Sequence, residues 1–113
     1  MDTTFAVELI KGVPTPWPRL EDDSYIMSTG STRPLEDAFR ISHADLVHWI
    51  ADGVGLSQLD AYQLVSQTAL TPVANVCDSN YTVVGKVAKA HLPGFTAYAG
   101  VHDRLRAIAA SLG

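Results

Sequence analysis

The chain has 113 residues, of which 47% are hydrophobic, and its formal net charge is −4. This length predicts one domain, residues 1–113, with a single small core. Its eight Lys and Arg residues never cluster, so the basic patch of a nucleic-acid-binding protein is missing. No apolar run reaches the roughly 18 residues that span a bilayer, and no signal-peptide pattern is present. A single cysteine excludes an internal disulfide and fits a reducing compartment. We therefore expect a cytoplasmic protein that binds neither nucleic acid nor membrane.

The first part of the chain predicts two strands and a connector. Residues 4–10 alternate apolar and polar side chains, which is typical of a strand. Residues 13–19 contain three prolines and favour an extended connector, with a proline-rich ligand for an SH3-like domain as the functional alternative. Residues 21–24, three of which are acidic, favour a solvated turn over a cation site, because no calcium-loop spacing is present. Residues 25–29 predict a second strand that ends at Gly30.

Two helices are expected in the middle of the chain. The first spans residues 35–50, and the hydroxyls of Ser31 and Thr32 are available to cap it. At 100° per residue, one apolar stripe of this helix is formed by Leu35, Phe39, Ser42, Leu46 and Ile50. Ser57 is expected to cap the second helix, which ends before Pro72 because a residue that precedes proline disfavours helical geometry.

The last part of the chain predicts two more strands and a helix. Residues 73–77 form a short β-rich apolar run, and a polar turn that includes Asp78 follows it. Residues 81–92 predict a strand with Gly85 as a candidate bulge. Residues 94–113 are expected to form a tail that ends in a helix. The predicted fold class is therefore α+β, with a small, mainly antiparallel sheet of about four strands, two central helices and a C-terminal helix.

The four histidines do not predict a metal site. His43 and His48 are five residues apart on the first helix, so their side chains point about 140° apart and cannot reach one ion. His91 and His102 lie on separate elements, and no metal-binding spacing occurs. Histidines on the surface or satisfied by hydrogen bonds are the favoured interpretation.

Two further sets of residues carry candidate chemistry. A thiolate can attack an amide carbonyl, which makes Cys77 a candidate nucleophile. The adjacent Asp78 carboxylate disfavours a thiolate, so the sequence favours a buried structural cysteine instead. A small acid/base enzyme that uses His43 together with Glu36 or Asp45 is the other alternative.

Several short segments between residues 5 and 93 have a characteristic order and spacing. They are residues 7–12, 18–21, 25–30, the helix 35–50, residues 55–57 with Asp60-Ala61-Tyr62, and residues 73–76. Together they resemble the C-terminal part of the acetamidase/formamidase family. This resemblance implies an amide hydrolase that converts a small linear amide to a carboxylate and ammonia.

The resemblance also implies that this chain is the C-terminal portion of such an enzyme. Full-length members of the family are longer and carry Gly-Asp-x-His and Gly-Asp-Gly-Glu-like motifs, which this sequence lacks. No catalytic residue is therefore assigned, no cofactor is expected in this chain, and any divalent metal would belong to the full-length site. The expected partners are the small amide substrate, bound by the complete enzyme, and either further copies of the chain or a missing N-terminal portion. The alternative is a binding or assembly module without turnover.

Overall fold

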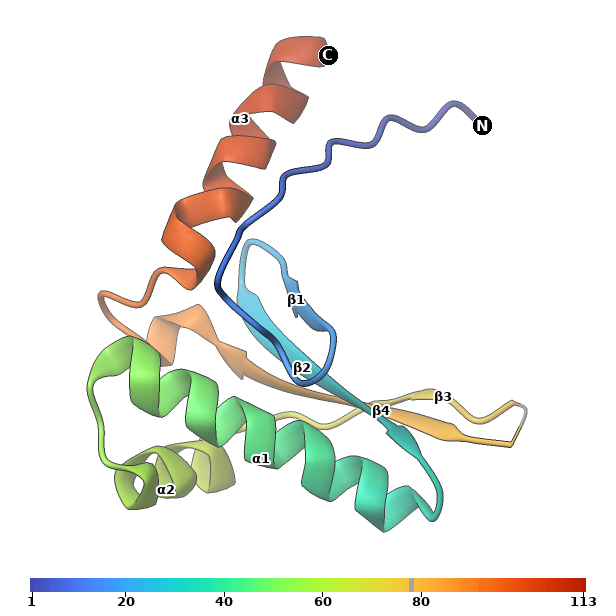
Figure 1. Ribbon diagram of the computed structural model, residues 1–113, viewed down its shortest axis with the longest axis vertical. Helices are drawn as coiled ribbons and strands as arrows, with labels where there is room; N and C mark the ends of the chain where they lie inside the picture. The colour runs from blue at the N-terminus through green and yellow to red at the C-terminus, as the bar shows by residue number, and fades with distance from the viewer. Residues whose placement is uncertain (78) are drawn as a thin grey trace. The chain divides into compact units, whose positions relative to one another are not determined.

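The computed structural model describes residues 1–77 and 79–113, so Asp78 and its predicted turn position lie outside the described residues. The chain divides into two compact units, which are described separately (Figure 1). The larger unit is Thr15–Phe95, and the smaller unit combines Met1–Pro14 with Thr96–Gly113. The expectation of a single domain stays a prediction.

The larger unit is built on an antiparallel sheet with the strand order β1-β2-β4-β3 (Figure 1). Its strands are β1 (Arg19–Glu21), β2 (Tyr25–Thr32), β3 (Val73–Asn75) and β4 (Tyr81–Ala88). The two long central strands pair without a shift along their whole length, from Tyr25 opposite Ala88 to Thr32 opposite Tyr81. This sheet, with helices packed on it, confirms the predicted α+β fold class.

One face of the sheet is covered by the long helix α1 (Leu35–Val54), and α2 (Gln58–Thr68) packs against α1 (Figure 1). Because side chains alternate along a strand, every second residue of β2 and β4 points toward α1. The largest fully buried apolar side chains of this layer are Ile26, Val83 and Val87 from the sheet and Leu46 and Ile50 from the helix. Each such side chain contributes about 1.5–3 kcal/mol of hydrophobic stabilisation.

Two glycines allow α1 to lie close to the sheet. A Cβ atom on Gly30 would lie 2.2 Å from the Ala38 carbonyl oxygen, which is fixed backbone. The second strand was predicted to end at Gly30. That prediction was wrong, because β2 continues through Gly30 to Thr32. Gly85 is likewise no bulge, since it pairs in register with Ser28. The irregularity in the sheet lies in β3 instead, between Val73 and Asn75.

The predicted strand at residues 4–10 was wrong, because no strand of the described residues pairs with them and their apolar side chains are exposed. Alternation makes a strand only where a neighbouring strand accepts its backbone hydrogen bonds. The fourth strand is β1 instead, whose first residue falls in the predicted connector and whose last residue falls in the predicted turn. The Pro18 carbonyl extends its ladder by accepting the Thr29 N–H at 3.1 Å. The last predicted strand is also shorter than expected, since β4 ends at Ala88 and a 3₁₀ turn follows.

A side-chain cap marks the start of α2 but not the start of α1. Ser57 caps α2 as predicted, since its Oγ accepts the Asp60 N–H at 3.1 Å. The N-cap of α1 is Pro34 without a side-chain cap, so the prediction of a hydroxyl cap from Ser31 or Thr32 was wrong. In the smaller unit, α3 (Val101–Leu112) is the predicted tail helix, and its Arg104 pairs with Glu8. Among the helices of the described residues, none has the length and apolar character needed to cross a membrane.

Candidate functional site

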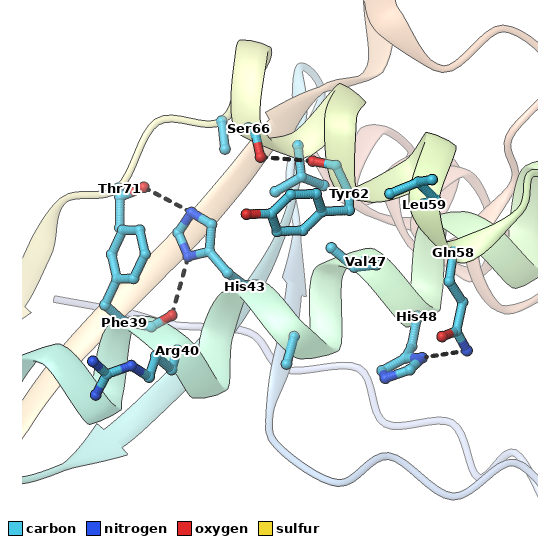
Figure 2. Close-up of a pocket in the computed structure, with 13 residues that line it drawn as sticks. Phe39, Arg40, His43, Val47, His48, Gln58, Leu59, Tyr62, Ser66 and Thr71 are labelled. Carbon is cyan, nitrogen blue, oxygen red and sulfur yellow. Dashed lines mark hydrogen bonds between the residues drawn. The ribbon is translucent and has the colours of Figure 1, made fainter.

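A groove of about 1040 Å³ lies between α1 and α2 in the larger unit (Figure 2). Its apolar lining comes from both helices and includes Phe39, Val47, Leu59, Tyr62 and Val65. Its polar lining includes Arg40, His43, His48, Gln58, Ser66 and Thr71. A mainly apolar concavity with a few converging polar groups is the usual form of a binding site, so this groove is the candidate site of the described residues.

His43 is held in a fixed orientation at one end of the groove (Figure 2). Its ring stacks on Phe39, with 4.0 Å between the ring centroids and 18° between the planes. Nδ1 lies 3.1 Å from the Phe39 carbonyl oxygen, and Nε2 lies 3.2 Å from the Thr71 hydroxyl. Since a carbonyl only accepts, Nδ1 carries the proton and Nε2 accepts from Thr71.

Burial lowers the pKa of His43, and the hydrogen bond to the Phe39 carbonyl offsets only part of that effect. The imidazole is therefore neutral at pH 7. Its partners among the described residues are Phe39, Ser42 and Thr71, and neither predicted carboxylate is one of them. Glu36 pairs with Arg40 on the exposed side of α1, at 3.3 Å. The His–carboxylate pair of the acid/base hypothesis is not formed.

Asp45, the second candidate carboxylate, lies on the sheet side of α1 instead. It accepts Nε and Nη2 of Arg19 at 2.9 and 2.6 Å and the Ser28 hydroxyl at 2.5 Å. The Arg19 guanidinium also lies 4.5 Å from the centre of the Trp49 ring. Burial raises the pKa of Asp45, but the hydrogen bonds from Arg19 and Ser28 and the charge of Arg19 outweigh it, so the pKa is lowered. This cluster fixes β1 and β2 to α1.

The buried stripe of α1 is rotated from the predicted one. Ser42, Leu46 and Ile50 are buried as expected, but Leu35 and Phe39 are exposed. The buried side chains of the helix are Ala38, Ser42, Asp45, Leu46, Trp49, Ile50 and Ala51. Asp45 sits among them, and a carboxylate beside the apolar stripe of a helix is the sequence signal that could have indicated a buried cationic partner. The displaced Leu35 and Phe39 line a second groove of about 510 Å³, next to the first.

Of the other candidate residues, His48 lines the groove and Cys77 does not. Cys77 is exposed, so the prediction of a buried structural cysteine was wrong. The Asn75 side chain bonds the N–H and the carbonyl of Cys77 and holds this backbone outside the core. His48 lies 3.3 Å from the Gln58 amide at the other end of the groove from His43 (Figure 2). Within the described residues, no three His, Cys, Asp or Glu side chains are close enough to hold a metal ion.

The solved structure of an acetamidase from Yersinia enterocolitica is similar to this one, with a TM-score of 0.71. The two sequences are 44% identical, and the match covers 74% of this chain. The predicted resemblance to the acetamidase/formamidase family is confirmed. The same match covers 25% of the acetamidase chain, so this chain spans about a quarter of the length of the enzyme that it resembles. A scan of protein-family models and a search of curated proteins gave no match.

Proposed function

We propose that this chain forms one portion of an amide hydrolase of the acetamidase/formamidase type, which converts a small linear amide to a carboxylate and ammonia. The proposal rests on the 44% identity to an acetamidase over 74% of the chain, together with the common fold at a TM-score of 0.71. The cytoplasmic location expected from the sequence is part of the same proposal.

The chemical groups for this reaction are proposed to lie in the part of the enzyme that this chain does not span. Amide hydrolysis needs a nucleophile or an activated water, an acid for the leaving amine and donors for the oxyanion. Both ring nitrogens of His43 have partners within the chain, and none is a carboxylate. Among the described residues, no group of three His, Cys, Asp or Glu side chains could by itself hold a metal ion. We therefore assign no catalytic residue and no metal ligand to this chain.

The proposed contribution of this chain is a rigid portion of the fold that completes the enzyme. The Arg19–Asp45 pair fixes the strands to α1, and the groove between α1 and α2 offers a preformed surface. The alternative function, a binding or assembly module without turnover, is favoured by the apolar side chains that this groove leaves exposed, such as those of Leu59 and Tyr62.

A chimera separates these two functions. The segment of the Yersinia acetamidase that matches this chain is replaced by it, and ammonia release from acetamide and formamide is measured with and without added divalent metal. The unmodified acetamidase is the positive control, and the isolated chain is measured in parallel. The proposal predicts turnover by the chimera and none by the isolated chain. A folded chimera that releases no ammonia would support the assembly module.

A further inference from the structure

An exposed apolar surface runs across the larger unit, and we name it the α1–α2 face. It consists of Leu35, Phe39, Leu59, Tyr62 and Val73, which are 40%, 45%, 65%, 60% and 44% exposed. These side chains line the two grooves described above, which share Phe39 and Thr71 as common lining residues. A continuous apolar surface of this kind marks a place where a protein contacts a partner.

We propose that, in the complete enzyme, the α1–α2 face is covered by the part of the acetamidase-type chain outside these 113 residues. This inference rests on the proposed function and names the partner of the same groove. The match covers 25% of the acetamidase chain, so most of that enzyme lies outside the matched part and is large enough to supply a covering segment. The occupant is an apolar segment of that remaining part.

The charges in the larger groove favour an apolar occupant. Burial lowers the pKa of His43, so its imidazole is neutral and already bonded to Phe39 and Thr71. The Arg40 guanidinium at the rim pairs with Glu36 and Asp37 at 3.3 and 2.7 Å. Among the described residues that line this groove there is no carboxylate. Apolar side chains such as Leu59 and Tyr62 are left to form the contact.

The shape of the face favours a segment of another part of the enzyme over a second copy of this chain. In a symmetric dimer the same surface meets itself, so each groove would face the identical groove of the other copy. Two grooves of about 1040 Å³ each, placed face to face, would leave a void between the two copies. Stable interfaces instead pack as densely as protein interiors. A protruding segment fills such a groove.

Thiol labelling tests whether the face is covered. In a Cys77→Ser background, a Tyr62→Cys variant places a thiol in the groove. A Gln67→Cys variant is the matched control, since Gln67 is exposed on the same helix and does not line the groove. Maleimide incorporation into each peptide is followed by mass spectrometry in the isolated chain and in the chimera with the Yersinia acetamidase. Because labelling is measured for each peptide separately, other cysteines of the chimera do not interfere.

The expected result is rapid labelling of both positions in the isolated chain. In the chimera, labelling at position 62 should slow about tenfold or more, as for a site that reacts only after local opening, with position 67 unchanged. Equal rates at position 62 in the isolated chain and in a folded chimera would overturn the proposal. Protection at position 62 in a folded but inactive chimera would support this inference while contradicting the proposed function.

Two further measurements complete the test. The first places a cysteine in the intact Yersinia acetamidase at the position equivalent to Tyr62, which avoids any need for a grafted chain to fold. Slow maleimide labelling of that cysteine is expected. Sedimentation of the isolated chain with and without Tyr62→Asp tests the second copy as occupant. Self-association that Tyr62→Asp abolishes, together with rapid labelling in the intact acetamidase, would overturn the proposal in favour of a dimer.

Discussion

Arg19 and Asp45 form a two-point ion pair, 2.9 and 2.6 Å long, that joins the short strand β1 to the middle of α1. Their side chains are 12% and 3% exposed, so the pair is largely shielded from bulk water. A buried pair of this kind costs desolvation energy, and its effect on stability is greatest when one partner is removed.

Replacement of Arg19 by Met should therefore destabilise the chain strongly. The substitution leaves the buried Asp45 carboxylate with the Ser28 hydroxyl but without its cation, and it removes the guanidinium that contacts Trp49. The expected loss is about 3–5 kcal/mol in the free energy of unfolding, measured by urea denaturation. Arg40→Met is the control, because its ion pairs are exposed and should cost less than about 1 kcal/mol. Equal losses for the two variants would contradict this account.

His43 should make the stability of the chain depend on pH in the weakly acidic range. Burial lowers its pKa in the folded state, whereas in the unfolded state it keeps the ordinary value of about 6.5. Below that pH the unfolded chain takes up a proton on His43 more readily than the folded chain does. The contribution of His43 to the free energy of unfolding is therefore fully present above about pH 6.5 and is lost as the pH decreases through the folded pKa. Urea denaturation at a series of pH values measures this.

The His43→Gln variant should lose this part of the pH dependence, and the contributions of the other histidines cancel in the comparison. Gln keeps a polar side chain at the same place without a titratable ring. A difference between the two chains that stays constant from pH 7.5 to pH 5 would show that His43 is not the group responsible.

Gly30 and Gly85 both face α1, and they should respond differently to substitution by alanine. The new Cβ of Gly30→Ala would meet the Ala38 carbonyl oxygen at 2.2 Å, and the helix backbone must move to relieve that overlap. We expect a loss of about 3 kcal/mol or more, the upper end for overpacked sites. Gly85→Ala meets the Leu46 side chain at 3.0 Å, which can shift, so a smaller loss is expected. Thermal unfolding checks the order, and the reverse order would refute the close approach at Gly30.

The N-cap of α2 offers a smaller test. Ser57→Ala removes the acceptor of the Asp60 N–H and should lower the free energy of unfolding by about 1 kcal/mol. Ser57→Asp restores an acceptor and should recover most of that loss, as measured by urea denaturation. If Ser57→Asp were as unstable as Ser57→Ala, the cap would not be the cause.

Local signals predicted the features that depend on neighbouring residues. The Ser57 cap and the end of α2 before Pro72 follow from bonds and clashes within a few residues, and both were predicted correctly. Strands were also predicted where β2 and β4 lie, at residues 25–29 and 81–92. The continuation of β2 through Gly30 was missed, because the reason for that glycine is the carbonyl of Ala38 on the next element.

The features that depend on distant residues were not predictable in the same way. Arg19 and Asp45 lie 26 positions apart, and a strand of three residues such as β1 has no periodicity of its own. Residues 4–10 show the reverse case, since their alternation is clear but no strand of the described residues pairs with them. Phe39 was assigned to the core from periodicity, whereas the phase of α1 is set by the sheet beneath it and by Asp45.

Ammonia release from acetamide, compared between the isolated chain and the chimera with the Yersinia acetamidase, tests the central claim most directly. If the chain completes an enzyme whose reacting groups lie elsewhere, the chimera should release ammonia and the folded isolated chain should not. Turnover by the isolated chain, lost in a His43→Gln or Cys77→Ser variant, would place the chemistry within these 113 residues and contradict the account.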